Sequence, residues 1–104
     1  MRKIYVCSPL SGDYGNNIEK AKNYSRLVVL RGFIPVTPHI YFTQFLDDSN
    51  PGEREIGVTL ALQCLRYCDE LWIFGGYISE GMNKEIELAN HLKIPIHYVK
   101  SDWL

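Results

Sequence analysis

The chain has 104 residues, which is the size of one domain, and its 46% hydrophobic content is ample for a packed core. Its 11 basic and 12 acidic residues give a net charge of -1, which argues against a basic surface that binds nucleic acid. No apolar run approaches the roughly 18 residues of a membrane span, so we expect no membrane partner.

The chain begins directly with a strand-like segment, so we expect no signal peptide and a cytoplasmic location. Its three cysteines, Cys7, Cys64 and Cys68, fall in expected strands or helices, and no turn offers the further ligands that zinc would need. We therefore expect buried free thiols in a reducing compartment, and no metal or other cofactor.

The first half of the chain alternates apolar strands with an amphipathic helix. A strand is expected at residues 3–7, and a polar loop with glycines follows at 8–17. Apolar residues at helical spacing predict a helix over 18–31. A second short strand follows at 33–37, and the aromatic-rich segment 38–48 has room for a short helix.

The second half opens with a helix-start signal. Asn50 is the expected N-cap, Pro51 occupies the first turn, and Glu53 stands three residues past the cap, as in a capping box. This helix is expected to run to about residue 68. The remaining elements are a strand at 70–74, a loop at 75–80, a helix at 81–93 and a strand at 96–99.

The alternation of apolar strands and helices predicts a single α/β domain spanning residues 1–104. Strands that are apolar on both faces need helices on both faces, and right-handed crossovers make the sheet parallel. We expect a three-layer αβα, Rossmann-like (flavodoxin-like) sheet of about four strands in the order 2-1-3-4. Ligands bind such sheets beyond the carboxyl ends of the strands, where the loops 8–17, 38–48 and 75–80 should meet.

Glu85 carries the sharpest functional signal. At about 100° per residue it falls about 60° from Met82, inside the apolar arc of its helix and close to the ligand-bearing edge. Isolated carboxylates are rarely buried without a partner. Glu85 is therefore either a site carboxylate, which we favour, or a boundary carboxylate bonded to a loop amide or to Tyr5.

Other candidate ligand contacts lie in the loops of the same edge. Glycines after the third strand let a backbone approach a ligand, and the helix start behind them favours an anion. The hydroxyls and amides of the first loop suit a phosphate or a sugar, although an ordinary polar turn has the same composition. The candidates are Ser8, Ser11, Gly12, His39, Gly75, Ser79, Gly81 and Met82.

Two further charged residues have competing interpretations. Asp69 starts the third strand, at the edge away from the ligand, and is expected to act as a cap. Arg54 lies in the first turn of its helix, where a cation is unfavourable to the helix dipole. It either pairs with Asp47 or Asp48 or reaches a ligand. His39 is either a contact to a base or sugar or a structural histidine.

Three segments together resemble the nucleoside 2-deoxyribosyltransferase-like superfamily over nearly the whole chain. The segment from Ile4 to Pro9 resembles its first strand, the segment from Asp69 to Gly75 its third strand, and the segment from Ser79 to Glu85 its Gly-x-x-x-Glu motif. The resemblance is closest to the small uncharacterised bacterial and phage branch, and it extends to the 2′-deoxynucleoside 5′-phosphate N-hydrolases.

The resemblance implies roles for individual residues. Glu85 matches the family nucleophile, and Tyr5 matches the tyrosine that steadies it. Ser79 stands where the transferases usually carry aspartate and where the phosphate-binding hydrolases carry serine, which makes Ser8 and Ser79 candidate phosphate contacts. Family enzymes carry an aspartate eight residues before the position of Asp69, where this chain has Ala61. That carboxylate helps to bind the substrate and handle the leaving base, so its replacement bears on catalysis rather than on the fold.

The expected function is cleavage or transfer at the N-glycosidic bond of a nucleoside or nucleotide by a carboxylate nucleophile. The alternative is a non-catalytic module of the same fold that senses or sequesters a nucleotide. Related enzymes complete their pocket from a neighbouring subunit, so we expect a homo-oligomer with the aromatic residues from Tyr41 to Phe45 as a plausible contact.

Overall fold

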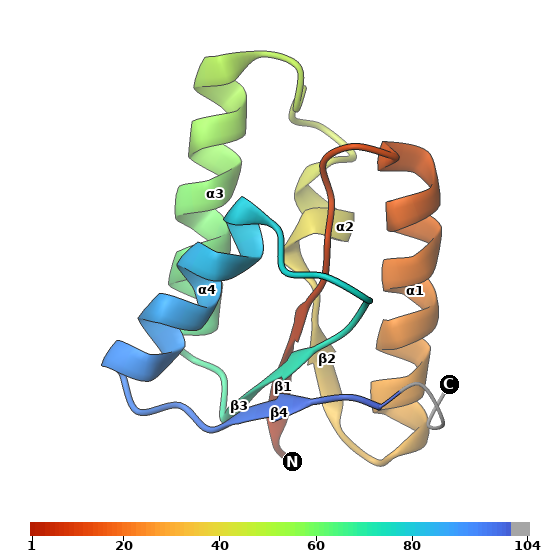
Figure 1. Ribbon diagram of the computed structural model, residues 1–104, viewed down its shortest axis with the longest axis vertical. Helices are drawn as coiled ribbons and strands as arrows, with labels where there is room; N and C mark the ends of the chain where they lie inside the picture. Colours follow the sequence, from red (N-terminus) through yellow and green to blue (C-terminus); the bar gives the residue numbers. More distant parts are fainter. Residues whose placement is uncertain (101–104) are drawn as a thin grey trace.

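The computed structural model describes residues 1–100, so the last four residues of the expected domain, 101–104, lie outside the described residues. Strands and helices alternate along the chain (Figure 1). In order, they are β1 (Lys3–Cys7), α1 (Tyr14–Leu30), β2 (Ile34–Val36), α2 (Pro38–Phe42), α3 (Pro51–Leu65), β3 (Glu70–Ile73), α4 (Glu80–His91) and β4 (Ile96–Tyr98).

The four strands form one parallel sheet in the order β2-β1-β3-β4, as predicted. Tyr5 in β1 stands opposite Val36 of β2 on one side and Leu71 of β3 on the other. All strands run in the same direction, so the loops that follow β1, β2 and β3 gather at one edge. This edge positions the candidate site.

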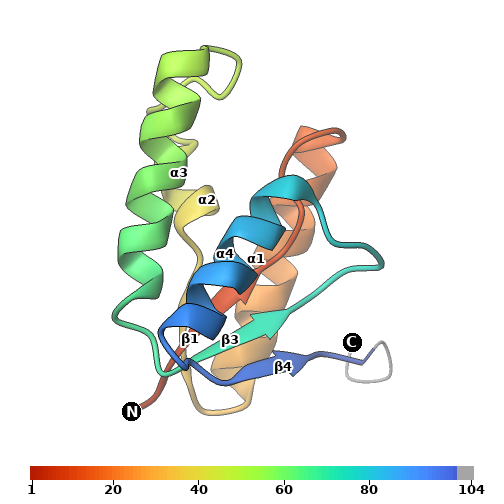
Figure 2. The ribbon, with the colours of Figure 1, turned by 60° about the vertical axis from the view of Figure 1, so that its left-hand side comes forward.

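Helices cover both faces of the sheet, which makes the predicted three-layer arrangement. Figures 1 and 2 show α1 on one side of the sheet and α3 with α4 on the other. Because successive side chains of a strand point to opposite faces, β1 contributes to two separate cores. Ile4 and Val6 pack with Tyr24 and Val28 of α1. Tyr5 and Cys7 pack on the opposite face.

The core on that opposite face is formed by the sheet, the end of α3 and the inward side of α4. Its buried members are Tyr5, Cys7, Leu65, Cys68, Leu71, Ile73, Met82 and Ala89. The polar groups of these residues, such as the Tyr5 hydroxyl and the Cys7 thiol, are therefore shielded from bulk water unless a pocket opens beside them.

The first helix begins earlier than predicted. We expected it from residue 18, whereas α1 starts at Tyr14. Asn17, which we placed in the loop, is buried in the helix and its amide donates to the carbonyl oxygens of Leu10 and Ser11 at 3.1 and 3.2 Å. A polar side chain that turns back onto the loop adds nothing to the apolar periodicity, which therefore indicated a later start.

The expected N-cap of α3 is confirmed, but the full capping box is wrong. The Asn50 side chain accepts hydrogen bonds from the backbone N–H groups of Gly52 and Glu53. The Glu53 carboxylate, however, accepts from the backbone N–H of Asp47 at 3.2 Å instead of bonding back to the cap. Glu53 thus joins the preceding loop to the helix, which ends at Leu65 rather than near residue 68.

Candidate functional site

A pocket of about 270 Å³ opens where the loops meet at the carboxyl edge of the sheet. Its wall includes residues from the β1 loop, α2 and the segment after it, α3, and the start of α4. The lining residues are Ser8, Leu10, Ser11, His39, Phe42, Thr43, Leu46, Asp48, Glu53, Arg54, Gly57, Val58, Ala61, Leu62, Ser79, Glu80, Gly81, Met82 and Glu85.

The Glu85 carboxylate lines this pocket and accepts hydrogen bonds from two side chains of β1. The Tyr5 hydroxyl donates a hydrogen bond to Glu85 Oε2, and the Cys7 thiol donates to Oε1 with an Sγ–Oε1 distance of 3.3 Å. The predicted hydrogen bond between Tyr5 and Glu85 is therefore present. Both carboxylate oxygens have a neutral donor on the sheet side, while the residue also reaches the pocket.

Burial dominates the electrostatics of this group. It raises the pKa of Glu85 to about 7, although the hydrogen bonds from Tyr5 and Cys7 act in the opposite direction. Burial, followed by the nearby Glu85 charge, also raises the pKa values of Tyr5 and Cys7 well above their usual range. Both remain protonated donors near neutral pH, where Glu85 itself exchanges between its acid and its carboxylate.

His39 and Ser8 form a second polar pair in the pocket. Ser8 Oγ lies 3.1 Å from His39 Nε2, which joins the first loop to α2. Burial lowers the pKa of His39 to about 4, so the imidazole is neutral at pH 7. A neutral imidazole offers one donor and one acceptor, which suits a sugar or base edge rather than an anion.

The start of α4 supplies the third polar group of the pocket. The Ser79 hydroxyl caps the helix by accepting a hydrogen bond from the backbone N–H of Met82 at 3.2 Å. The cap fixes where α4 begins and places Glu85 on the second turn, facing the sheet. The cap uses one acceptor lone pair of this oxygen, so the hydroxyl can still donate its hydrogen to a ligand.

Arg54 reaches the pocket rather than an acidic partner. Its Nη2 donates to Ser11 Oγ at 3.0 Å, and in the described part of the chain it forms no ion pair with Asp47 or Asp48. Of the two interpretations of Arg54, the geometry favours the one in which it faces a ligand. The arginine brings a fixed positive charge to the pocket rim.

One side of the pocket is apolar, and α2, α3 and the neighbouring loops contribute to it. Ala61, in the place of the aspartate expected from the resemblance, lies among these wall residues. The apolar members are Leu10, Phe42, Leu46, Val58, Ala61 and Leu62. Such a wall suits the flat face of an aromatic ring more than its polar edge.

The structure brings most of the sequence candidates together. Ser8, Ser11, His39, Ser79, Gly81, Met82 and Glu85 line the pocket, and Tyr5 lies directly behind Glu85. Gly12 and Gly75 are not among the lining residues. Gly12 has φ +96° in the turn before α1. Gly75 has φ +98°, and a Cβ there would lie 3.2 Å from Pro9 Cδ, so its place is in the turn after β3.

Sequence reasoning missed the thiol at the site. We expected Cys7 only as a buried free cysteine, yet it contacts the same carboxylate as Tyr5. The available signal was strand periodicity, because residues two apart in a strand share a face. The apolar α3 wall was also missed. Its side chains face a pocket rather than a core, which a sequence pattern does not distinguish.

Two observations concern the outer surface of the protein. In residues 1–100, no helix is long and apolar enough to cross a membrane. Tyr41 and Phe45 are 61% and 58% exposed and contact each other edge to face. They remain available for the predicted contact between subunits, and the homo-oligomer stays a prediction.

The fold and the pocket together define a three-layer α/β protein with a pocket at the carboxyl edge of its sheet. A family profile described as "Domain of unknown function (DUF7768)" matches residues 2–99, and the chain belongs to this family.

Among solved structures, the chain is similar to a 2-deoxyribosyltransferase from the psychrotolerant bacterium Bacillus psychrosaccharolyticus, described as a biocatalyst for the synthesis of nucleosides. The TM-score is 0.72 at 15% sequence identity, over 92% of this chain and 70% of that one. This likeness shows that the two proteins share a fold. No curated protein matches the chain.

Proposed function

We propose that the protein cleaves or transfers the N-glycosidic bond of a nucleoside or nucleotide, with Glu85 as the nucleophile. One observation carries the proposal: a partly buried carboxylate in a pocket receives hydrogen bonds from Tyr5 and Cys7. A carboxylate held by neutral donors keeps its orientation without being neutralised by a cation. The fold shared with a 2-deoxyribosyltransferase supports the same class of substrate.

In the proposed reaction, a Glu85 oxygen attacks the anomeric carbon while the bond to the base breaks through an oxocarbenium-like state. The base leaves with the electron pair of that bond. The product is a glycosyl ester of Glu85. Water then attacks the ester and restores the carboxylate, giving hydrolysis, or a second base attacks and gives transfer.

The surroundings of Glu85 set the pH range of this chemistry. Only the ionised carboxylate is a nucleophile, and its pKa is raised to about 7 by burial. The rate of base release should therefore rise with pH through about 7 and then level. His39 is neutral, so Arg54 is the cationic side chain of a lining that also holds Asp48, Glu53 and Glu80. Arg54 suits a substrate with an anionic group at the rim.

The alternative is a nucleotide-binding module without catalysis, and Ala61 is the observation that favours it. This residue lines the pocket at the position where the resembled enzymes carry an aspartate. Without that carboxylate, this position of the wall offers no acid to the leaving base. The pocket would then bind its ligand and release it unchanged.

The experiment is a panel of nucleosides and their 5′-monophosphates, assayed for free base by chromatography and for binding by calorimetry. Under the proposal, at least one compound releases base, and Glu85→Gln lowers that rate by about a thousandfold or more while binding is largely kept. Glu87→Gln is the matched control, because Glu87 is exposed on the same helix and should leave the rate unchanged. Binding without base release by the wild-type protein would favour the binding module.

A further inference from the structure

Cys7 has a contact that the proposed reaction does not yet use. Residues two apart in β1 share a face of the sheet, so Cys7 stands one step beyond Tyr5 towards the carboxyl edge. Both side chains are fully buried. From this row the two residues reach different oxygens of one carboxylate, Tyr5 contacting Oε2 and Cys7 contacting Oε1 of Glu85.

The Cys7 thiol has two possible acceptors, and their distances show which one it bonds to. Its sulfur lies 3.3 Å from Glu85 Oε1 and 4.0 Å from the carbonyl oxygen of Met82, one turn earlier on α4. The shorter contact is the hydrogen bond, since sulfur donors bond weakly beyond this range. The carbonyl becomes the alternative acceptor when Glu85 is protonated on the facing oxygen.

We infer that Cys7 is a positioning residue for Glu85, whose thiol donates to Oε1 and, together with the Tyr5 hydroxyl on Oε2, fixes the plane of the carboxylate and favours its ionised form. A single donor on Oε2 would leave the carboxylate free to rotate about its last bond. The second donor removes that freedom and adds a hydrogen bond that exists fully only with the charged group. The catalytic consequence rests on the proposed function, whereas the contact and its effect on ionisation do not.

Other titratable groups surround the same carboxylate, but from the pocket walls. They are His39 on α2, Asp48 before α3, Glu53 and Arg54 on α3, and Glu80 on α4. Cys64 on α3 acts on Tyr5 from the helix side. In the described residues, the hydrogen bonds to the Glu85 carboxylate come from Tyr5 and Cys7. The titration of Glu85 should therefore respond more strongly to a change at Cys7 than to a change at any of these other groups.

The direct test is the titration of Glu85 by carbon-13 NMR with labelled glutamate, its resonance being assigned by loss in Glu85→Gln. Cys7→Ala removes the donor and should move the midpoint upward by about 0.5–1 pH unit. Cys7→Ser keeps a donor and should return the midpoint towards the wild-type value. Cys68→Ala is the matched control, because its buried thiol donates to the Cys64 carbonyl at 3.5 Å and is not bonded to Glu85.

A second measurement observes the Cys7 thiol of the wild-type protein directly. The S–H stretching band of Cys7, isolated as the infrared difference between wild type and Cys7→Ala, should shift as pH crosses the Glu85 midpoint. If Cys7→Ala fails to fold, Cys7→Ser provides the difference spectrum and the titration. A Cys7 S–H band that does not shift across the Glu85 midpoint, together with a Glu85 midpoint unchanged in Cys7→Ala, would overturn the inference. Equal midpoint shifts in Cys7→Ala and Cys68→Ala would overturn it as well.

Activity distinguishes this inference from the proposed function. If a substrate releases base, Cys7→Ala should lower kcat with little change in KM and move the rising limb of the pH profile to higher pH. If no compound of the panel releases base from the wild-type protein, the proposed function fails, while the titration and the infrared band still decide the role of Cys7.

Discussion

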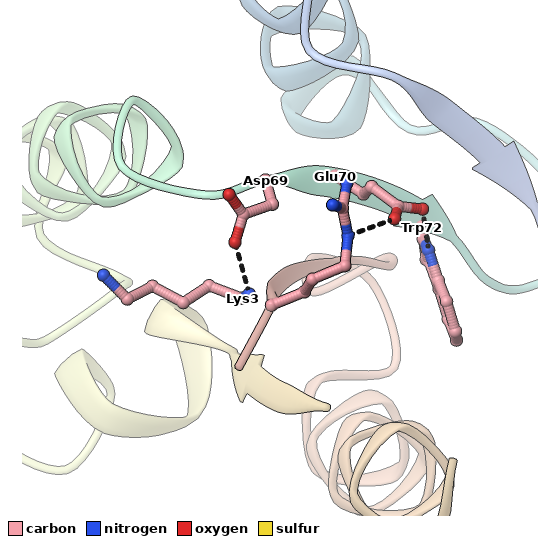
Figure 3. Close-up of polar contacts among 5 residues, drawn as sticks. Lys3, Asp69, Glu70 and Trp72 are labelled. Atoms are coloured by element: carbon pink, nitrogen blue, oxygen red, sulfur yellow. Dashed lines mark hydrogen bonds and ion pairs between the residues drawn. The ribbon is translucent and has the colours of Figure 1, made fainter. Parts of the chain in front are cut away.

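At the amino-terminal end of the sheet, two carboxylates near the surface bond to a backbone N–H and to an arginine. At the carboxyl end, the Glu85 carboxylate is largely buried and bonds to neutral donors. Figure 3 shows Asp69 accepting from the Lys3 backbone N–H, at 2.7 Å, and Glu70 accepting from the Trp72 indole at 3.1 Å. Glu70 also accepts from the Arg2 guanidinium at 2.9 Å. Within residues 1–100, Glu85 accepts hydrogen bonds from a hydroxyl and a thiol and forms no ion pair with a cation.

The difference teaches what each end of the sheet is suited for. An acid with a backbone N–H or a cation as its partner joins neighbouring segments of the sheet edge together. A carboxylate enclosed with neutral donors changes its protonation near pH 7, because burial opposes its charge more than the two donors support it. The enclosed arrangement suits acid–base or nucleophilic chemistry, and the open one adds side-chain contacts at the edge of the sheet.

The largest expected effect is on stability as a function of pH. The pKa of Glu85 is raised from 4.5 to about 7, so the folded protein holds this proton more tightly than the unfolded chain. Its contribution is complete below pH 4.5, falls as pH rises towards about 7, and spans at most about 3 kcal/mol. Urea unfolding at a series of pH values should show this slope in the wild type and in Glu87→Gln, and should lose it in Glu85→Gln. Parallel curves for all three proteins would contradict the comparison.

Tyr5→Phe removes one of the two donors at the enclosed end and keeps the ring in the core. If the protein releases base, the rate should fall by about 10–100-fold, and the rising limb of its pH profile should move to higher pH. The measurement is a pH series of initial rates. Tyr24→Phe is the control, because Tyr24 stacks on Phe74 on the opposite face of the sheet. An unchanged rate and profile in Tyr5→Phe would mean that the hydroxyl does not act on the carboxylate.

The smallest effect is expected at the open end. Asp69→Ala removes the acceptor for the Lys3 N–H, which should lower the free energy of unfolding by about 1 kcal/mol. The Glu85 titration should stay as in the wild type, since the two groups lie at opposite ends of the strands. Urea unfolding and the NMR titration check the two halves of this prediction. A moved Glu85 midpoint would show that the ends are coupled.

The order of the sheet and the enclosed carboxylate were both predictable from sequence. Continuous apolar strands between helices permit few arrangements, and Glu85 stood out because a charge inside an apolar arc needs a reason. The start of α1 was not predictable from periodicity, because the Asn17 side chain turns back to the loop. The partner of Glu53 depended on where the preceding loop lies, which local sequence does not fix.

Parts of the site were missed because they depend on tertiary contacts between residues far apart in the sequence. Cys7 and Glu85 are 78 positions apart and meet only once α4 packs on β1. Gly75 was expected to approach a ligand, but its positive φ and its closeness to Pro9 assign it to the turn. Strand and helix periods indicate which face a residue occupies. They do not indicate whether that face meets a core or a cavity.

The apolar wall of the pocket has a consequence for how this family can diversify. Leu65 is the buried residue of α3, while Val58, Ala61 and Leu62 are only half-buried and face the pocket. Replacing them should reshape the ligand space without disturbing the strands that hold Glu85. Tyr5 and Cys7 lack this freedom, because they belong to the core and to the site at once. Inherited variation in ligand choice should therefore accumulate along α3, while β1 stays fixed.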